Sequence, residues 1–288
     1  MFDRRQFLMG STAAGALTLG GCAVPIASSL GSGDAAAQAR ALYDAIFERM
    51  LETSPEMATG LGLDTGARAH LRTRLIDLST QGKLRAYRPM VEALPRLRQI
   101  DRAALSPREA AWLDTVIWVG ERFSEAATFP YGGVGGYNYP IPYVLSQLTG
   151  SYQEVPDFLD SQHKVETAAD AEAYLSRLGD FARNVNREVD HARADAGRGV
   201  VPPPFIIDKA LTQTRTLRGE SGAASGLVQS LVRRTREKGI AGDWGGRAAA
   251  IVDGPLASAL DRQIAALTEL RGRGGAVGAS NLPDGERF

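Results

Sequence analysis

Apolar side chains recur every three or four positions along most of this 288-residue chain, and that spacing is typical of amphipathic helices. Between Ala35 and Thr53, for example, Leu42, Ile46 and Met50 recur at intervals of four and mark one apolar face. Ser54, a possible N-cap, and Pro55 at the first helical position predict a short second helix. Apolar spacing predicts longer helices over residues 81–100, 107–123, 168–197, 224–238 and 247–270.

Two of these helices have clear start signals. Ser106 can cap the helix that begins at Pro107, and Glu109 can reach back to complete a capping box. Thr167 and Asp170 have the same spacing at the start of the helix over 168–197. Both helices are therefore predicted to begin at these residues.

Two segments interrupt the helical pattern. The stretch Gly132–Phe158, GGVGGYNYPIPYVLSQLTGSYQEVPDF, is rich in Gly, Pro and Tyr and is predicted to form a long loop. Gly199–Ile207 contains three consecutive prolines and is predicted to be extended, in polyproline rather than sheet conformation. Since alternating strand patterns are nearly absent, the predicted fold is all-α, a multi-helix bundle or array with one long Gly/Pro/Tyr-rich loop.

The amino terminus has the layout of a secretory signal peptide. A charged start precedes an apolar run, Phe7–Leu19, that is too short to span a bilayer well. Arg4 and Arg5, followed by Phe-Leu, resemble a twin-arginine export signal, from which Asp3 and Met9 depart. A Sec-type signal with two coincidental arginines is the alternative.

The only cysteine, Cys22, directly follows this apolar run. The residues Leu-Gly-Gly-Cys that end at Cys22 resemble a bacterial lipobox, in which the cysteine sulfur receives a diacylglycerol and the chain is cut just before it. The sequence therefore predicts an exported, periplasmic lipoprotein anchored to a membrane. Cleavage near Ala37, after an Ala-Ala-Ala run, is the alternative and would give a soluble periplasmic protein.

These features divide the chain into three parts. Residues 1–22 are the twin-arginine-type lipoprotein signal peptide, residues 23–34 a flexible Gly/Ser/Ala tether, and residues 35–288 the helical domain. The 33 Lys plus Arg balance the 33 Asp plus Glu, and no basic arm is present, which argues against nucleic acid as a partner. The predicted partner is the membrane, reached through the lipid on Cys22.

The three histidines do not have the spacing of a zinc site. A helical zinc peptidase needs two histidines four residues apart with a glutamate between them, and His70, His163 and His191 have no such partner. His163 and Glu166 are three apart, but no further ligand is near in the sequence. His191 lies on the charged side of its helix and is expected to be exposed. No metal site is predicted in this chain.

The glycine-rich loop raises the question of phosphate binding or nucleophilic catalysis. It lacks the Lys-Ser/Thr pair of a P-loop and no strand precedes it, and Ser146 lacks the flanking glycines of a hydrolase nucleophile. No catalytic residue is therefore predicted. The loop does concentrate neutral hydrogen-bonding groups on apolar bodies, which are typical of a substrate groove. The candidate substrate-lining residues are Tyr137, Asn138, Tyr143, Gln147, Ser151 and Tyr152. The alternative is that these tyrosines cap a core beneath a long loop.

Two stretches carry a resemblance to a known family. PYVLSQLTGSYQEVPDFLDSQHKVETAADAEAYLSRLGDFA, followed by GVVPPPFIIDKAL, resembles the amino-terminal half of the bacterial family catalogued as domain of unknown function 885. The resemblance implies a helical, often exported protein, roughly twice as long, whose carboxy-terminal half carries an HExxPGH zinc motif like that of gluzincin-like metallopeptidases. This sequence does not contain that motif. We therefore expect a truncated member whose zinc and partner half are absent, with zinc bound only by the full-length protein.

Two functional hypotheses follow. In the first, the chain is the amino-terminal half of an exported, lipid-anchored metallopeptidase-like hydrolase, inactive alone, whose loop lines a peptide-binding groove. In the second, it is a non-catalytic, membrane-tethered periplasmic module that binds a peptide or a glycan. Whether this chain is itself an enzyme is left open by the sequence.

Overall fold

A computed structural model describes residues 30–135 and 138–288. Within these residues the chain forms ten α-helices, several short 3-10 turns and one two-stranded sheet, so the predicted all-α class is confirmed. The helices are α1 (Leu30–Thr53), α2 (Pro55–Gly60), α3 (Thr80–Leu97), α4 (Pro107–Thr128), α5 (Ser151–Ser161), α6 (Ala168–Gly197), α7 (Pro204–Gly219), α8 (Gly226–Glu237), α9 (Trp244–Ile251) and α10 (Ala257–Arg273). The strands are β1 (Gly133–Val134) and β2 (Pro140–Ile141).

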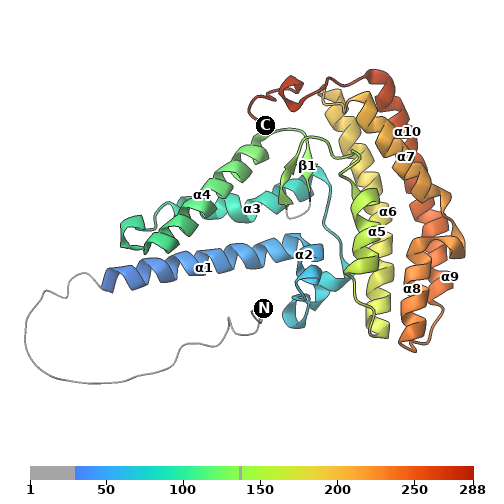
Figure 1. Cartoon of the computed structure of the whole chain (residues 1–288), viewed down its shortest axis with the longest axis horizontal. Coiled ribbons are helices and arrows are strands. Elements are labelled where there is room, and N and C mark those ends of the chain that lie inside the picture. Colours follow the sequence, from blue (N-terminus) through green and yellow to red (C-terminus); the bar gives the residue numbers. More distant parts are fainter. Residues whose placement is uncertain (1–29, 136–137) are drawn as a thin grey trace, which may run out of the picture.

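Helices α1, α3 and α4 form an arm that extends away from the rest of the molecule (Figure 1). Helix α3 packs against both α1 and α4, and their apolar faces meet in one cluster. Leu42 and Ile46, two residues of the predicted α1 face, lie in this cluster beside Met90, Leu97 and Leu113. Helix α1 begins at Leu30, inside the segment expected to be a tether.

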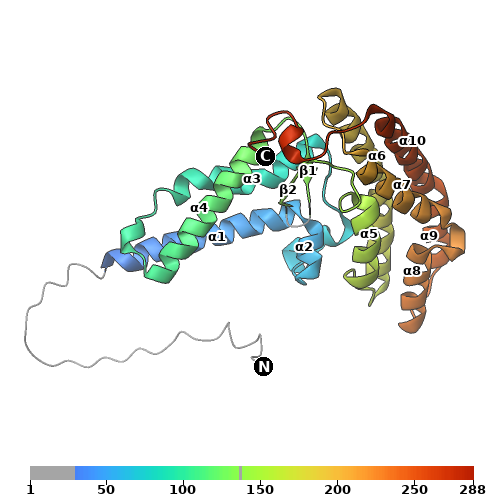
Figure 2. The same cartoon turned by 45° about the horizontal axis from the view of Figure 1, so that its top comes forward.

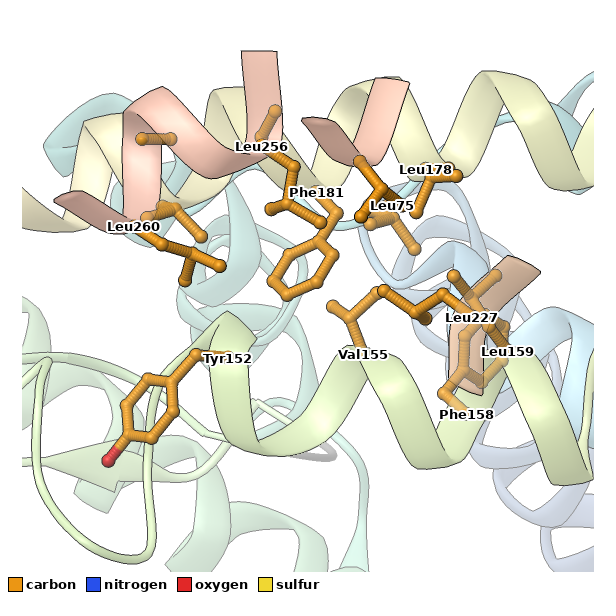
Figure 3. Close-up of a cluster of buried hydrophobic side chains, with 14 of the residues drawn as sticks. Leu75, Tyr152, Val155, Phe158, Leu159, Leu178, Phe181, Leu227, Leu256 and Leu260 are labelled. Atoms are coloured by element: carbon orange, nitrogen blue, oxygen red, sulfur yellow. The ribbon is translucent and has the colours of Figure 1, made fainter. Parts of the chain in front are cut away.

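Helix α6 is the centre of the second group of helices. It packs against α5, α8, α9 and α10, and α10 packs in turn against α7 (Figure 1). The main apolar core lies between them, where Val155, Phe158 and Leu159 of α5 meet Leu178 and Phe181 of α6 (Figure 3). Because most faces of α6 are covered, several of its polar residues are buried, and Asn184, Glu188 and Asp195 are each less than 4% exposed.

The predicted start signals are confirmed for α4 and α6. Ser106 and Glu109 form a reciprocal capping box at the start of α4, and Thr167 and Asp170 form one at the start of α6. At α2 the proline takes the first helical position as predicted, but the hydroxyl of Ser54 makes no cap hydrogen bond. That hydroxyl is used elsewhere, as described below.

Two predicted boundaries are wrong. The loop predicted over Gly132–Phe158 ends at Gly150, because Ser151–Ser161 is helical despite its internal Pro156. The extended segment predicted to Ile207 ends at Pro203, because Pro204 takes the first helical position of α7, where a missing N–H costs nothing. The single helix predicted over 247–270 is present as α9 and α10, which run together through a wider, π-helical turn that contains a proline, Val252–Leu256.

The short sheet fixes the loop after α4 against α3 and α6. β1 and β2 pair antiparallel, with Gly133 opposite Ile141. The amide of Gly132 donates to the carboxylate of Asp195 at 2.9 Å, and Tyr87 Oη of α3 donates to the carbonyl of Gly133 at 3.1 Å. In the described part of the chain, no helix is long and apolar enough to cross a bilayer.

A candidate cleft lined by carboxylates

A cleft of about 570 Å³ lies where α2, β1 and α5 meet. In Figure 2, α2 and β1 lie between the arm and α5, which is at the edge of the second group of helices. Its apolar walls are formed by Met57, Leu61, Ile76, Leu78, Val134, Val155 and Phe158. Its polar lining is formed by Ser54, Glu56, Asn138, Ser151, Gln153, Glu154, Asp157, Gln162 and Asn184.

Glu56, in the first turn of α2, is half-buried in the cleft wall. Both of its carboxylate oxygens lie 3.0 Å from the backbone N of Ile76, so the side chain ties α2 to the segment before α3. Burial raises the pKa of Glu56 to about 7, against the lowering effect of the Ile76 amide and of the Arg177 charge. This carboxyl therefore changes its charge near neutral pH.

Helix α5 provides two further carboxylates, Glu154 and Asp157. Val155 and Phe158 of this helix are buried, whereas Glu154 and Asp157 lie on the neighbouring, exposed face, and all four line the cleft. Both carboxylates are solvent-exposed, yet the cleft walls around Glu154 desolvate its carboxyl and raise its pKa. Glu154 and Glu56 line the same cleft, and the charge of Glu154 adds to the rise in the pKa of Glu56.

The start of α5 is capped from another helix. Its N-cap residue, Gly150, has no side chain, and Glu188 of α6 supplies the missing acceptor. The amide and hydroxyl of Ser151 donate to the two carboxylate oxygens of Glu188, at 2.8 and 2.7 Å. Burial raises the pKa of Glu188 to about 8, although the Ser151 bonds oppose this. The contact holds α5, and with it Glu154, in position.

Asn138 lines the cleft from the loop side and is 1% exposed. Its backbone is left-handed, with φ of 62°, which Asn tolerates better than most residues. The hydroxyl of Ser54 donates to Asn138 Oδ1 at 3.0 Å, which explains why Ser54 does not cap α2. Among the described residues, Asn138 Nδ2 has no hydrogen-bond partner.

The structure places the sequence-predicted loop residues in different surroundings. Asn138 and Ser151 line the cleft. Tyr152 points its hydroxyl to the carbonyl of Ser146, and Tyr143 packs beside the cluster of Phe129, Tyr131, Val200 and Leu282. Gln147 is half-buried, and its carbonyl accepts from Gln213 at 3.4 Å. Tyr137, Arg4, Arg5 and Cys22 lie outside the described residues.

Sequence analysis missed the carboxylates of the cleft. Glu154 and Asp157 belong to a helix that was taken for loop, and Glu56 belongs to a helix too short to show a pattern. One signal was available: Tyr152, Val155 and Leu159 have helical spacing, which would have placed Glu154 on the opposite side of a helix from this apolar face.

The histidines do not fit a zinc site. His163 is 2% exposed, accepts from Arg177 at 2.7 Å through Nδ1, and is 3.0 Å from the Asp170 carbonyl through Nε2. Because arginine can only donate, Nε2 must carry the hydrogen, and burial lowers the His163 pKa to about 4. His70 is exposed and contacts Glu52. The described residues contain no group of three side chains placed to hold a metal ion.

The expectation that His191 is exposed is wrong. It is 5% exposed, because the loop after α4 and the segment before α3 cover that side of α6. Its Nε2 lies 3.7 Å from Asp195, and burial lowers its pKa. Lys83 is buried on the same side, where its ammonium donates to the carbonyl of Phe129 at 2.9 Å. This polar cluster holds the loop in place beside the cleft.

The comparisons with known proteins identify the family. Residues 55–288 match the family described as "Bacterial protein of unknown function (DUF885)", whereas no curated protein matches the chain. A solved structure, "the putative lipoprotein from Colwellia psychrerythraea", has the same fold, with a TM-score of 0.74 at 14% identity over 88% of this chain. The match covers 44% of that protein, so this chain spans less than half of its length. The resemblance inferred from the sequence is confirmed, and the chain belongs to the DUF885 family.

Proposed function

We propose that this chain is the substrate-binding half of an exported, lipid-anchored hydrolase of the peptidase type, and that an extended peptide lies in the cleft between α2 and α5. The observation that carries the proposal is the cleft. Its volume of about 570 Å³ is within the range of ligand-binding pockets, and its lining combines apolar walls with amide and carboxyl groups. Such a lining suits a peptide, which has both apolar side chains and hydrogen-bonding backbone groups.

The hydrolytic groups are assigned to a second half. The HExxPGH motif that the family resemblance implies is not present in residues 1–288, and the histidines of this chain do not fit a zinc site. The fold matches 44% of the Colwellia protein, which leaves room in such a relative for a catalytic half. No chemical step is therefore assigned to residues of this chain.

The lipid anchor rests on two observations. The sequence around Cys22 resembles a lipobox, and the Colwellia protein is described as a lipoprotein. A lipid on Cys22 would hold the domain at a membrane surface without a spanning helix.

The proposal is tested by titrating the purified chain with a pool of short peptides in a calorimeter, with and without zinc. We expect binding without hydrolysis. Replacing Leu61, an exposed residue of the cleft wall, by Trp should fill the cleft and abolish binding. The matched control is Leu148→Trp, because Leu148 is also exposed but does not line the cleft.

Three outcomes would change the proposal. Zinc-dependent peptide hydrolysis by this chain alone would contradict the assignment of catalysis to a second half. Peptide binding that survives Leu61→Trp would contradict the cleft as the site. Binding of oligosaccharides, but of no peptide, would favour the alternative of a non-catalytic glycan-binding module.

A further inference from the structure

The charged residues that line the cleft all have the same sign. They are Glu56, Glu154 and Asp157, and no Lys, Arg or His is among the described lining residues. Many surface carboxylates elsewhere are paired: Asp114 binds Arg102 through two nitrogens, and Glu172 binds Arg247 in the same way. In the described part of the chain, no ion pair involves the three carboxylates of the cleft. Their negative charge is therefore available to a ligand.

The buried cation that acts on Glu56 does not occupy the cleft. Arg177 acts on Glu56 through its charge, but it is fully buried behind the wall. Its guanidinium is committed to the carbonyls of Arg74 and Leu71, to Thr59 and to His163. It thus cannot move into the cleft to neutralise Glu154 or Asp157 without breaking these bonds.

A second, independent feature also indicates a ligand. Asn138 is 1% exposed and lines the cleft, and within the described residues its Nδ2 donates to nothing. A buried amide donor without an acceptor costs about 1–3 kcal/mol, and native proteins rarely leave one unused. A backbone carbonyl of a peptide in the cleft would be a suitable acceptor.

The carboxylates do not form a metal site. The described residues contain no group of three acidic or histidine side chains close enough to share an ion. Glu56 is on α2, whereas Glu154 and Asp157 are on α5. Charges spread along an apolar-walled cleft suit an extended organic cation better than a metal ion.

We propose that the cleft selects peptides that carry an organic cation, an ammonium or a guanidinium group, which lies between Glu56 and Glu154, while Asn138 Nδ2 donates to a backbone carbonyl of the same peptide. This inference rests on the proposed function, since it names the substrate class of that cleft. The cation belongs either to a Lys or Arg side chain or to a free amino terminus, and the experiment separates these two sources.

The test compares three peptides by calorimetry on the full chain at pH 7.5 and low salt. The probes are acetyl-Ala-Lys-Leu-Ala-amide, the same peptide with norleucine in place of lysine, and the norleucine peptide with a free amino terminus. At least one cationic peptide is expected to bind ~10-fold or more tightly than the uncharged one, because a charge-assisted hydrogen bond contributes about 1.5–3 kcal/mol. Tighter binding of the lysine peptide would identify a side-chain cation, and tighter binding of the norleucine peptide with a free amino terminus would identify the terminal ammonium.

Variants connect this preference to the residues. Glu154→Gln should reduce the preference to about 3-fold or less without affecting folding, because the Glu154 side chain makes no hydrogen bond to the described residues. The control is Asp190→Asn, an exposed carboxylate outside the cleft, which should keep the full preference. Glycine tolerates the left-handed backbone of residue 138, so Asn138→Gly should keep the loop conformation. This variant should weaken the binding of cationic and uncharged peptides equally.

The possible failures are distinguishable. If all three peptides bind equally tightly and Leu61→Trp abolishes their binding, the cation preference is wrong but the peptide cleft stands. If the preference survives both Glu154→Gln and Glu56→Gln, the cation lies elsewhere and the inference is wrong. If no peptide binds, the proposed function fails together with this inference.

Discussion

Ser151 and Glu188 are joined by two hydrogen bonds, from the Ser151 amide at 2.8 Å and from its hydroxyl at 2.7 Å. The carboxyl caps one helix from the middle of another, and it does so at 2% exposure. This contact also positions part of the cleft wall, because Ser151 and Glu154, which share one helical turn, both line the cleft. The energetics of Glu188 therefore bear directly on the candidate site.

Replacing Glu188 by Gln should change how stability depends on pH. Burial raises the pKa of Glu188 from about 4.5 unfolded to about 8 folded, so the folded state holds its proton longer than the unfolded state. The wild-type protein should consequently lose stability as the pH rises through this window. Between pH 5 and pH 8, the free energy of unfolding of Glu188→Gln should rise relative to that of the wild type by about 3–4 kcal/mol.

The measurement is urea unfolding of both proteins at several pH values. Gln can accept from the Ser151 amide and donate to its hydroxyl, so the cap is retained and the two proteins should be similar near pH 5. Parallel pH curves for the two proteins would show that Glu188 is already ionised when folded.

Replacing Arg177 by Lys should strongly destabilise the fold. Arg177 is 0% exposed and bonds to four residues on three neighbouring segments, a geometry that one ammonium cannot reproduce. The expected loss in the free energy of unfolding is about 2–4 kcal/mol. The control on the same helix is Arg183→Lys, because Arg183 is largely exposed and should change stability by less than about 0.5 kcal/mol. Equal effects at both positions would contradict the role given to Arg177.

Replacing Gly132 by Ala should cost more than the same change at Gly62. Both glycines have left-handed backbones, with φ of 71° and 70°, and Ala pays about 1–2 kcal/mol for that conformation. A Cβ at Gly132 would also lie 2.4 Å from the carbonyl oxygen of Ile141, whereas one at Gly62 would meet nothing within 4 Å. Gly132→Ala is expected to exceed Gly62→Ala by about 1–3 kcal/mol in thermal or urea unfolding. If the two substitutions destabilise the protein equally, β1 and β2 can move apart to accept the Cβ atom without a cost in stability.

Replacing Cys22 by Ala should release the protein from the membrane. If Cys22 carries a diacylglycerol, the wild-type protein partitions into detergent and has the mass of a lipidated chain cut before Cys22. The variant should then stay in the aqueous phase or remain uncleaved. A wild-type mass that fits cleavage near Ala37 would instead favour the soluble alternative, whatever the variant does.

Local features of the fold could be predicted from the sequence, whereas features that depend on distant contacts could not. The capping box of Ser106 and Glu109 was predictable because its partners are three residues apart. Proline misled the prediction at Pro156 and Pro204, since a helix tolerates proline in its first turn and adjusts to it elsewhere when packing favours the helix. His191 was misplaced because no local pattern shows that a loop will cover the charged side of α6.

The candidate site was harder to predict than the fold, for the same reason. The Ser54–Asn138 bond joins residues 84 positions apart, and Glu188 reaches Ser151 across 37 positions. Sequence composition indicated this segment, and two of the six predicted substrate-lining residues, Asn138 and Ser151, do line the cleft. The acidic character of the cleft arises only when α2 and α5 are brought together.

The long sequence separation between Ser54 and Asn138 also has a consequence for folding kinetics. Closing a loop of this length has an entropic cost that must be met before the contacts across it contribute, so the two walls of the cleft should meet late. Helices α3 and α4, which lie within that loop, can pair earlier because they are neighbours in the chain. A partly folded chain would then have a formed arm and no cleft, and would gain ligand affinity only in its final folding step.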